Sequence, residues 1–276
     1  MRRSRSILAL VVALALALVV GKSVAARTGL APSRAPAADT TLKPTVPGDF
    51  NVRVLEHRGK RYFYQVFIPR DYSPNRQWPV IMALHGAARR GSDNVLQIRG
   101  GLATIVREQA ATFPAIVVLP QSPAGTRGSD FVPFLAPMLD AEMKALNGDP
   151  ARVYLTGLSF GGFLAYDFAT RDPTRFAALV PVASSIDITA ATGRSSAPKD
   201  SVYAAIAMRL RAVPMWVFQG ENDESVPAAE VRRIVQTFRA AGGDVRYTEF
   251  PGAPHDVWEQ TYRTPELFRW LFAQHR

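Results

Sequence analysis

From about residue 50 onward, two hydrophobic patterns alternate along the chain. Short continuous apolar runs end at glycine or proline, and the longer segments between them repeat apolar positions at helical spacing. Continuous apolar runs of this length predict strands of a parallel sheet that is buried on both faces. We predict strands at Arg61–Ile68, Pro79–Leu84, Ala115–Leu119, Arg152–Thr156, Ala178–Val182, Met215–Phe218 and Val245–Phe250.

The segments between the strands carry helix signals. Val226–Ala241 has a proline near its start and a pair of glycines after its end, and Thr264–Glu266 opens a final helix. Strand–helix alternation predicts the α/β class, with a mostly parallel sheet and helices on both faces. Ser184–Arg211 separates two predicted strands, and we expect it to form a small cap excursion beside the site.

The N-terminus has the pattern of a secretory signal peptide. Arg2, Arg3 and Arg5 precede the apolar run Ile7–Val20, and small residues around Ala25 form a cleavage pattern. We therefore predict a signal peptide over residues 1–25 and an exported protein, periplasmic or secreted. The apolar run is shorter than the roughly 20 residues of a spanning helix. An uncleaved anchor is the alternative, and membrane contact is expected only through it.

A segment rich in alanine and proline follows, and we predict a flexible linker over residues 26–49. The α/β domain is then expected to occupy residues 50–276.

Composition narrows the chemistry. The 276 residues contain no cysteine, which excludes disulfides, thiolate metal sites and a thiol nucleophile. The formal net charge is +10, but no basic run or nucleic-acid motif accompanies it, so we expect no nucleic-acid partner. With only 4 histidines we expect neither a metal nor a cofactor, and the sequence does not indicate an oligomeric state.

Candidate chemistry lies directly after the predicted strands. Gly157-Leu158-Ser159-Phe160-Gly161 is a G-x-S-x-G pattern between a strand and a helix. This sharp turn lifts a serine hydroxyl clear of the sheet, and the strand and the helix pass so closely that the flanking positions must be glycine. Ser159 is therefore the predicted nucleophile.

A serine nucleophile needs a base, and the base needs an orienting carboxylate. His255 lies in the turn after the last predicted strand, whereas His275 is at the end of the chain. Asp223 follows the preceding strand, with Glu221, Glu224 and Asp187 as alternatives. The order Ser159, Asp223, His255 is the serine–acid–histidine order of α/β hydrolases.

An oxyanion formed at Ser159 needs at least two amide donors. We predict the N–H of Phe160 and, from the loop after the second strand, that of Ala87, with Ala88 as the alternative. His85 precedes this loop, and a structural role is expected for it.

Four motifs together resemble those of exported α/β-hydrolase serine esterases. They are LHG at Leu84–Gly86, GLSFGG at Gly157–Gly162, GENDESVP at Gly220–Pro227 and PHDVW at Pro254–Trp258. The nearest groups are phospholipase/carboxylesterases, dienelactone hydrolases, polyhydroxybutyrate depolymerases and feruloyl esterases. This resemblance spans Tyr62 to the C-terminus and implies an α/β-hydrolase fold with Ser159 as nucleophile, Asp223 as acid and His255 as base. Two alanines follow Gly86, where the HGGG esterases have a glycine run.

The expected activity is hydrolysis of a small-molecule or polymeric carboxylic ester through an acyl-enzyme. A serine peptidase, an acyltransferase and a non-catalytic binding protein on the same fold are the alternatives. For the pocket wall the aromatic residues near the strand ends are candidates, namely Trp258, Tyr262, Phe131 and Phe134.

Overall fold

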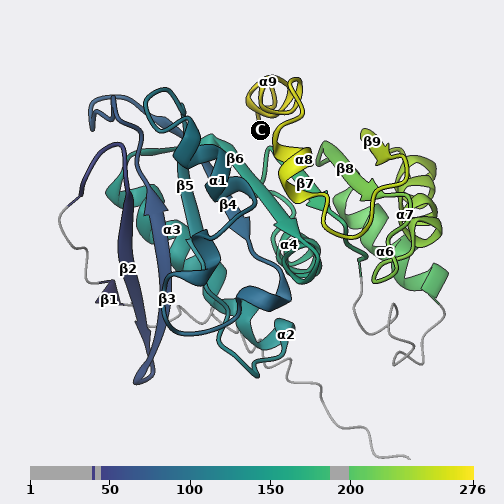
Figure 1. Ribbon diagram of the computed structural model, residues 1–276, viewed down its shortest axis with the longest axis horizontal. Coiled ribbons are helices and arrows are strands. Elements are labelled where there is room, and N and C mark those ends of the chain that lie inside the picture. The colour runs from purple at the N-terminus through teal and green to yellow at the C-terminus, as the bar shows by residue number, and fades with distance from the viewer. Residues whose placement is uncertain (1–38, 41–44, 187–198) are drawn as a thin grey trace, which may run out of the picture. The chain divides into compact units, whose positions relative to one another are not determined.

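A sheet of nine strands runs through the described part of the chain (Figure 1). The computed structural model describes residues 39–40, 45–186 and 199–276. The predicted signal peptide, most of the predicted linker, Asp187 and the centre of the predicted cap lie outside these residues. In sheet order the strands are β1 (Asp39–Thr40), β2 (Phe50–His57), β3 (Lys60–Phe67), β5 (Ile116–Pro120), β4 (Trp78–Leu84), β6 (Gly148–Leu158), β7 (Ala178–Val182), β8 (Met215–Gly220) and β9 (Val245–Phe250).

Strands β4 to β9 are all parallel to one another, and β1, β2 and β3 add an antiparallel edge. The predicted mostly parallel sheet is confirmed. Each predicted strand matches an observed one, although β6 begins before Arg152 and runs from Gly148. No strand was predicted over β2, whose residues alternate in exposure because one face of the sheet is open there. Asp39–Thr40, within the predicted linker, pairs with β2.

Helices cover both faces of the sheet, as predicted. Successive side chains of β4 enter opposite layers: Val80 and Met82 join one core, and Ile81 and Ala83 join the other. The first core includes α3 (Leu135–Ala145), α4 (Phe160–Arg171), α6 (Lys199–Leu210) and α7 (Ala228–Ala240), and the second α1 (Leu102–Glu108), α8 (Trp258–Tyr262) and α9 (Leu267–Phe272).

The segment predicted as a cap contributes a helix to the first core. In α6, Tyr203, Ala207 and Leu210 are fully buried against this core. Val202 and Ile206 of the same helix are only partly buried. Helix α6 is therefore part of the core packing, and two of its apolar side chains remain partly exposed.

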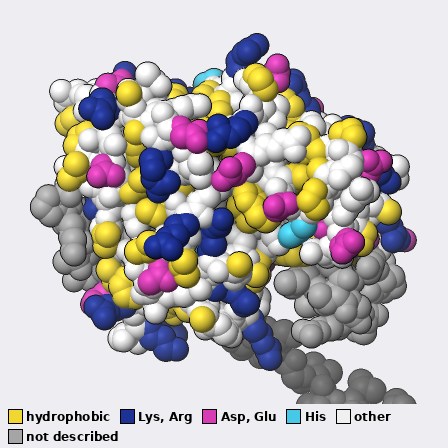
Figure 2. All heavy atoms as spheres, viewed as in Figure 1, with side chains coloured by type: hydrophobic (Ala, Val, Ile, Leu, Met, Phe, Trp, Pro, Cys, Tyr) yellow, Lys and Arg dark blue, Asp and Glu magenta, His cyan; other side chains and the backbone are white. Residues whose placement is uncertain are grey.

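Charges of both signs are spread over the face seen in Figure 2, among apolar side chains, and Lys and Arg lie over α1 and over α2 (Gly128–Phe131). Within the described residues, no helix combines the length and the apolar character needed to span a bilayer.

Candidate active site

Ser159 occupies the turn between β6 and α4 in a strained conformation. Its φ is +51°, in the left-handed region that residues with a side chain rarely adopt. A Cβ added to Gly157 would lie 2.2 Å from the carbonyl oxygen of Gly161, and one added to Gly161 would lie 2.1 Å from that of Leu84. The close packing of the strand and the helix therefore requires glycine at both positions.

The structure brings Ser159, His255 and Asp223 together from three strand ends. His255 Nε2 lies 2.9 Å from Ser159 Oγ, and His255 Nδ1 lies 2.7 Å from Asp223 Oδ2. Asp223 follows β8 and His255 follows β9, and both strands are parallel to β6. The carboxyl ends of parallel strands share one edge of the sheet, which is why residues far apart in sequence meet there.

Asp223 is held as a buried carboxylate. Its Oδ1 accepts hydrogen bonds from the N–H groups of Ser225 and Val226, each at 2.8 Å, and its Oδ2 also accepts one from Gln219 Nε2 at 2.8 Å. Burial raises the pKa of Asp223, but the hydrogen bonds from His255, Val226 and Gln219 outweigh it and hold this pKa below its ordinary value. Asp223 is therefore ionised at neutral pH and fixes the ring of His255.

Unpaired amides border Ser159. In the described part of the chain, the N–H groups of Phe160, Ala87 and Ala88 have no acceptor in the protein. Phe160 begins α4, and Ala87 begins a short 3₁₀ turn, Ala87–Arg89, after β4. Ala87 lines the same pocket as Ser159, and Ala88 does not, which favours Ala87 as the second donor.

His85 lies buried beneath this loop. Its Nδ1 is 2.7 Å from the carbonyl oxygen of Gly86, and its Nε2 is 2.9 Å from the backbone N of Ser122. Because Nε2 must accept the Ser122 hydrogen bond, Nδ1 carries the proton and donates to Gly86. Burial, aided by the charges of Arg89 and Arg90, outweighs that bond and lowers the pKa of His85 to about 4, so the ring is neutral at pH 7.

A cavity of about 880 Å³ opens at Ser159. The apolar part of its wall comes mainly from α4 and α6: Phe160, Phe163, Leu164, Val202 and Ile206. The α4 residues recur at spacings of three and four, so the helix turns them to one side. That spacing is visible in the sequence, but deciding which of its apolar positions remain uncovered required the packing.

The predicted aromatic wall residues lie elsewhere. Phe131 is 1 % exposed and packs in the first core, with its ring tilted against those of Tyr62 and Phe134. Tyr262 is buried in the second core, where its hydroxyl lies 2.7 Å from Thr156 Oγ1. Trp258 contacts the ring of His255 edge-on, with 5.9 Å between the centroids, but is not part of the cavity wall.

The alternative acids and bases do not approach Ser159. Glu221 Oε2 accepts the N–H of Gly252, and among the described contacts neither Glu224 nor His275 has a hydrogen bond to the site. In the described residues, no group of three or more histidine, aspartate or glutamate side chains could hold a metal ion.

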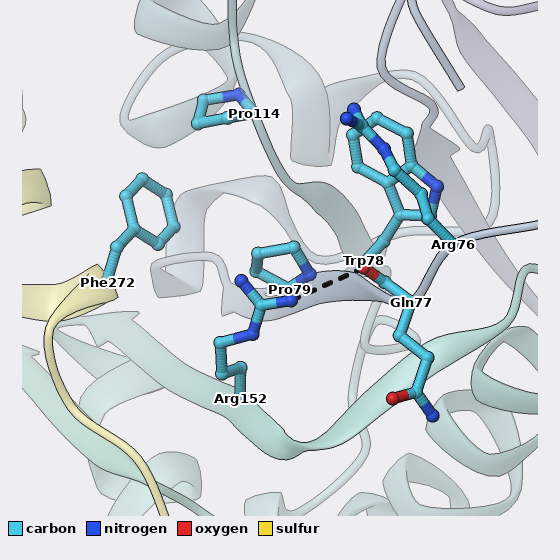
Figure 3. Close-up of a pocket in the computed structure, with 7 residues that line it drawn as sticks. All are labelled: Arg76, Gln77, Trp78, Pro79, Pro114, Arg152 and Phe272. Carbon is cyan, nitrogen blue, oxygen red and sulfur yellow. Dashed lines mark hydrogen bonds between the residues drawn. The ribbon is translucent and has the colours of Figure 1, made fainter. Parts of the chain in front are cut away.

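A second cavity, of about 340 Å³, lies near the amino ends of β4 and β6 (Figure 3). Arg76 stacks on Trp78 there, and Arg152 donates a hydrogen bond to the carbonyl oxygen of Gln77 at 3.3 Å. Both arginines already have carboxylate partners, at 2.6 Å in each case. This cavity is at the end of the sheet remote from Ser159 and holds no nucleophile.

The chain is similar to several known esterases. A crystal structure of a thermostable esterase matches 83% of this chain and 64% of its own with 30% identity and a TM-score of 0.69. A ferulic acid esterase matches 81% of this chain and 97% of its own with 20% identity and a TM-score of 0.63. The bifunctional acetylxylan esterase/xylanase XynS20E of Neocallimastix patriciarum is 25% identical over 179 residues, 63% of this chain and 23% of the fungal protein.

The sheet order, the two helical layers and the serine at the strand-to-helix turn define an α/β hydrolase. The prolyl oligopeptidase family matches residues 136–274, half of the sequence, and the chain belongs to that family. The chain spans less than two thirds of the thermostable esterase and under a quarter of the esterase/xylanase.

Proposed function

We propose that the protein is a serine hydrolase that cleaves carboxylic esters through an acyl-enzyme on Ser159. The observation that carries the proposal is the continuous hydrogen-bonded series from Ser159 Oγ through His255 to Asp223 Oδ2, at 2.9 Å and 2.7 Å. The similarity to a thermostable esterase and to an acetylxylan esterase/xylanase supports an ester as the substrate.

In the first step, Ser159 Oγ attacks the ester carbonyl carbon while its proton passes to His255 Nε2. Asp223 stabilises the imidazolium that forms, and the amides of Phe160 and Ala87 bind the oxyanion. The alcohol leaves with the proton from His255. Water, deprotonated by the same nitrogen, then attacks the acyl-enzyme, and the acid leaves as Ser159 regains its proton.

Ser159→Ala tests this proposal. The substitution removes the nucleophile, and turnover of a 4-nitrophenyl ester should fall by at least ~10⁴-fold. Labelling by a fluorophosphonate probe should disappear with it. Circular dichroism and the thermal unfolding midpoint report whether the fold is retained. Full activity or full labelling in a folded Ser159→Ala variant would contradict the assignment.

A serine peptidase is the second candidate, because the matched family takes its name from an oligopeptidase. The same three side chains could cleave an amide. A panel of peptide amides and esters separates the two, since an esterase should show the higher kcat/KM on esters at equal acyl groups. An added alcohol that accelerates acyl-enzyme breakdown would instead indicate an acyltransferase.

We also propose that the protein is exported, on the basis of the predicted signal peptide over residues 1–25. Mass spectrometry of the protein isolated from its host should find an N-terminus just after Ala25. An N-terminus at Met1 in the membrane fraction would indicate the anchored alternative.

A further inference from the structure

Two arginines without an acidic partner line the cavity at Ser159. Arg90 follows the 3₁₀ turn after β4, and Arg127 precedes α2. In the described parts of the chain, neither guanidinium lies within ion-pair distance of a carboxylate. Both border the same cavity as the candidate nucleophile.

Arg90 is fixed in place rather than free in solvent. Its Nε donates a hydrogen bond to the carbonyl oxygen of Ala87 at 3.2 Å. Its guanidinium carbon lies 5.2 Å from the ring centroid of Phe160, the residue next to the nucleophile. The side chain is half-buried, and its two terminal nitrogens have no partner within the described residues. A guanidinium held this way presents a planar pair of donors, which matches an anion with two oxygens.

The remaining charge of the cavity wall is already neutralised. Asp167 is its acidic residue, and Arg171 Nε and Nη2 bind its two carboxylate oxygens at 2.7 Å and 3.0 Å. The wall also has apolar residues from α4 and α6, among them Phe163, Val202 and Ile206. The cavity therefore combines an apolar wall with net positive charge.

We propose that the preferred substrate is an ester that carries a second, anionic group, a carboxylate or a phosphate, bound by Arg90 and Arg127, with its apolar body against α4 and α6. This inference rests on the proposed esterase function. Because each arginine reaches the cavity from a different loop, an anion between them would also fix the orientation of the ester relative to Ser159.

Matched ester pairs test the charge preference. 4-Nitrophenyl hydrogen adipate and its methyl ester differ by one negative charge in the acyl part of the substrate. 4-Acetoxybenzoate and its methyl ester differ by one negative charge in the alcohol part. 4-Acetoxyphenyl phosphate tests the phosphate. The protein should show about ten-fold higher kcat/KM on at least one anionic member than on its neutral partner. Salt should reduce this ratio more than it changes the neutral rate.

Arg90→Gln and Arg127→Gln should each reduce the anionic-to-neutral ratio several-fold, and Arg90→Lys should retain part of it. The side chain of Arg127 is exposed and makes no described hydrogen bond, so its variant tests the inference without endangering the fold. Arg232→Gln removes the same charge on α7, outside the cavity wall, and should leave the ratio unchanged.

The outcomes separate the inference from the function on which it rests. Hydrolysis of neutral and anionic esters at equal kcat/KM, or an unchanged ratio in both cavity variants, would overturn the inference and leave the esterase standing. Absence of Ser159-dependent hydrolysis on every ester would overturn both.

Discussion

His85 shows how one buried side chain can set the direction of an amide at the site. A trans peptide places its N–H opposite its C=O. The ring holds the carbonyl of Gly86 at 2.7 Å, so the N–H of Ala87 in the same peptide points away from the ring. The second ring nitrogen accepts the N–H of Ser122 and ties this loop to the one after β5. His85 is therefore a positioning residue for the proposed oxyanion site.

Replacing His85 should affect catalysis in a graded way. His85→Leu keeps the volume but loses both hydrogen bonds, and kcat should fall about 10- to 100-fold because the amide of Ala87 is no longer held. His85→Asn retains a donor for Gly86 and should keep more of the activity. KM should change little in either variant, and an unchanged kcat in His85→Leu would contradict the positioning role.

The same histidine makes stability depend on pH. The unfolded chain binds this proton below pH 6.5, but the folded chain binds it only near pH 4. The contribution of the neutral His85 ring to the free energy of unfolding is therefore complete above pH 6.5 and is lost as the pH falls to about 4. The shift corresponds to roughly 3 kcal/mol. Urea unfolding at several pH values should show this loss in the wild type but not in His85→Leu. His275→Asn, at an exposed position, should behave as the wild type.

At the scale of an element, the loop from β8 to α7 is organised by Gln219. This fully buried side chain donates from Nε2 to Asp223 Oδ2 and to the carbonyl oxygen of Val226, both at 2.8 Å. Gln219 thereby joins the end of the strand to the segment before the helix. It also shares Asp223 Oδ2 with His255, so it helps to set the orientation of the carboxylate.

Gln219→Met should lower kcat about ten-fold with KM nearly unchanged, because a hydrogen bond to a charged group is lost while the volume is kept. Gln219→Glu should be worse, and increasingly so as the pH rises, since the introduced carboxyl ionises beside Asp223. Steady-state kinetics across pH measure both. Gln236→Met makes the first change on the exposed face of α7 and serves as the control. Equal kcat values in the wild type and Gln219→Met would refute this role.

Strands and strand-end residues could be predicted from the sequence where a local pattern determines them. Continuous apolar runs identified the parallel strands, and the residues after β6, β8 and β9 could be placed at one sheet edge because parallel strands share it. The position of Phe131 was not predictable, because its direction depends on packing between α2 and Tyr62. The contribution of α6 to the cavity wall likewise depends on which face of that helix the first core covers.

At the scale of the whole molecule, the two halves of the chain complete one site. The family match covers residues 136–274, which contain Ser159, Asp223 and His255. Ala87 and Arg90 come from the preceding half. Strand β4 of that half lies between β5 and β6, so the loop that follows it reaches the turn of Ser159. Correct docking of the first half onto α3 and β6 is thus a condition for a complete site.

A buried ion pair links the two halves. Arg53 of β2 and Glu142 of α3 are 1 % and 0 % exposed, with Nε and Oε1 3.4 Å apart, and the hydroxyl of Tyr64 donates to the same oxygen at 2.9 Å. The cost of burying these two charges is only partly offset, because Arg53 Nε and Glu142 Oε2 have no hydrogen-bond partner. Burial also keeps the pKa of Glu142 above its ordinary value despite the opposing effects of Arg53 and Tyr64.

This incomplete compensation predicts opposite results for single and double substitutions. Glu142→Met leaves the charge of Arg53 buried without a counter-ion, and Arg53→Met does the same to Glu142, so each single variant should reduce the free energy of unfolding by about 3–5 kcal/mol. The double variant, with methionine at both positions, removes both desolvation costs and should restore most of that loss. Urea unfolding measures each variant, with Arg263→Gln, at an exposed ion pair, as the control. A double variant as unstable as the sum of its singles would show that the two side chains act independently. Recovery would show that the first half needs a filled contact at this position, and not the charges themselves.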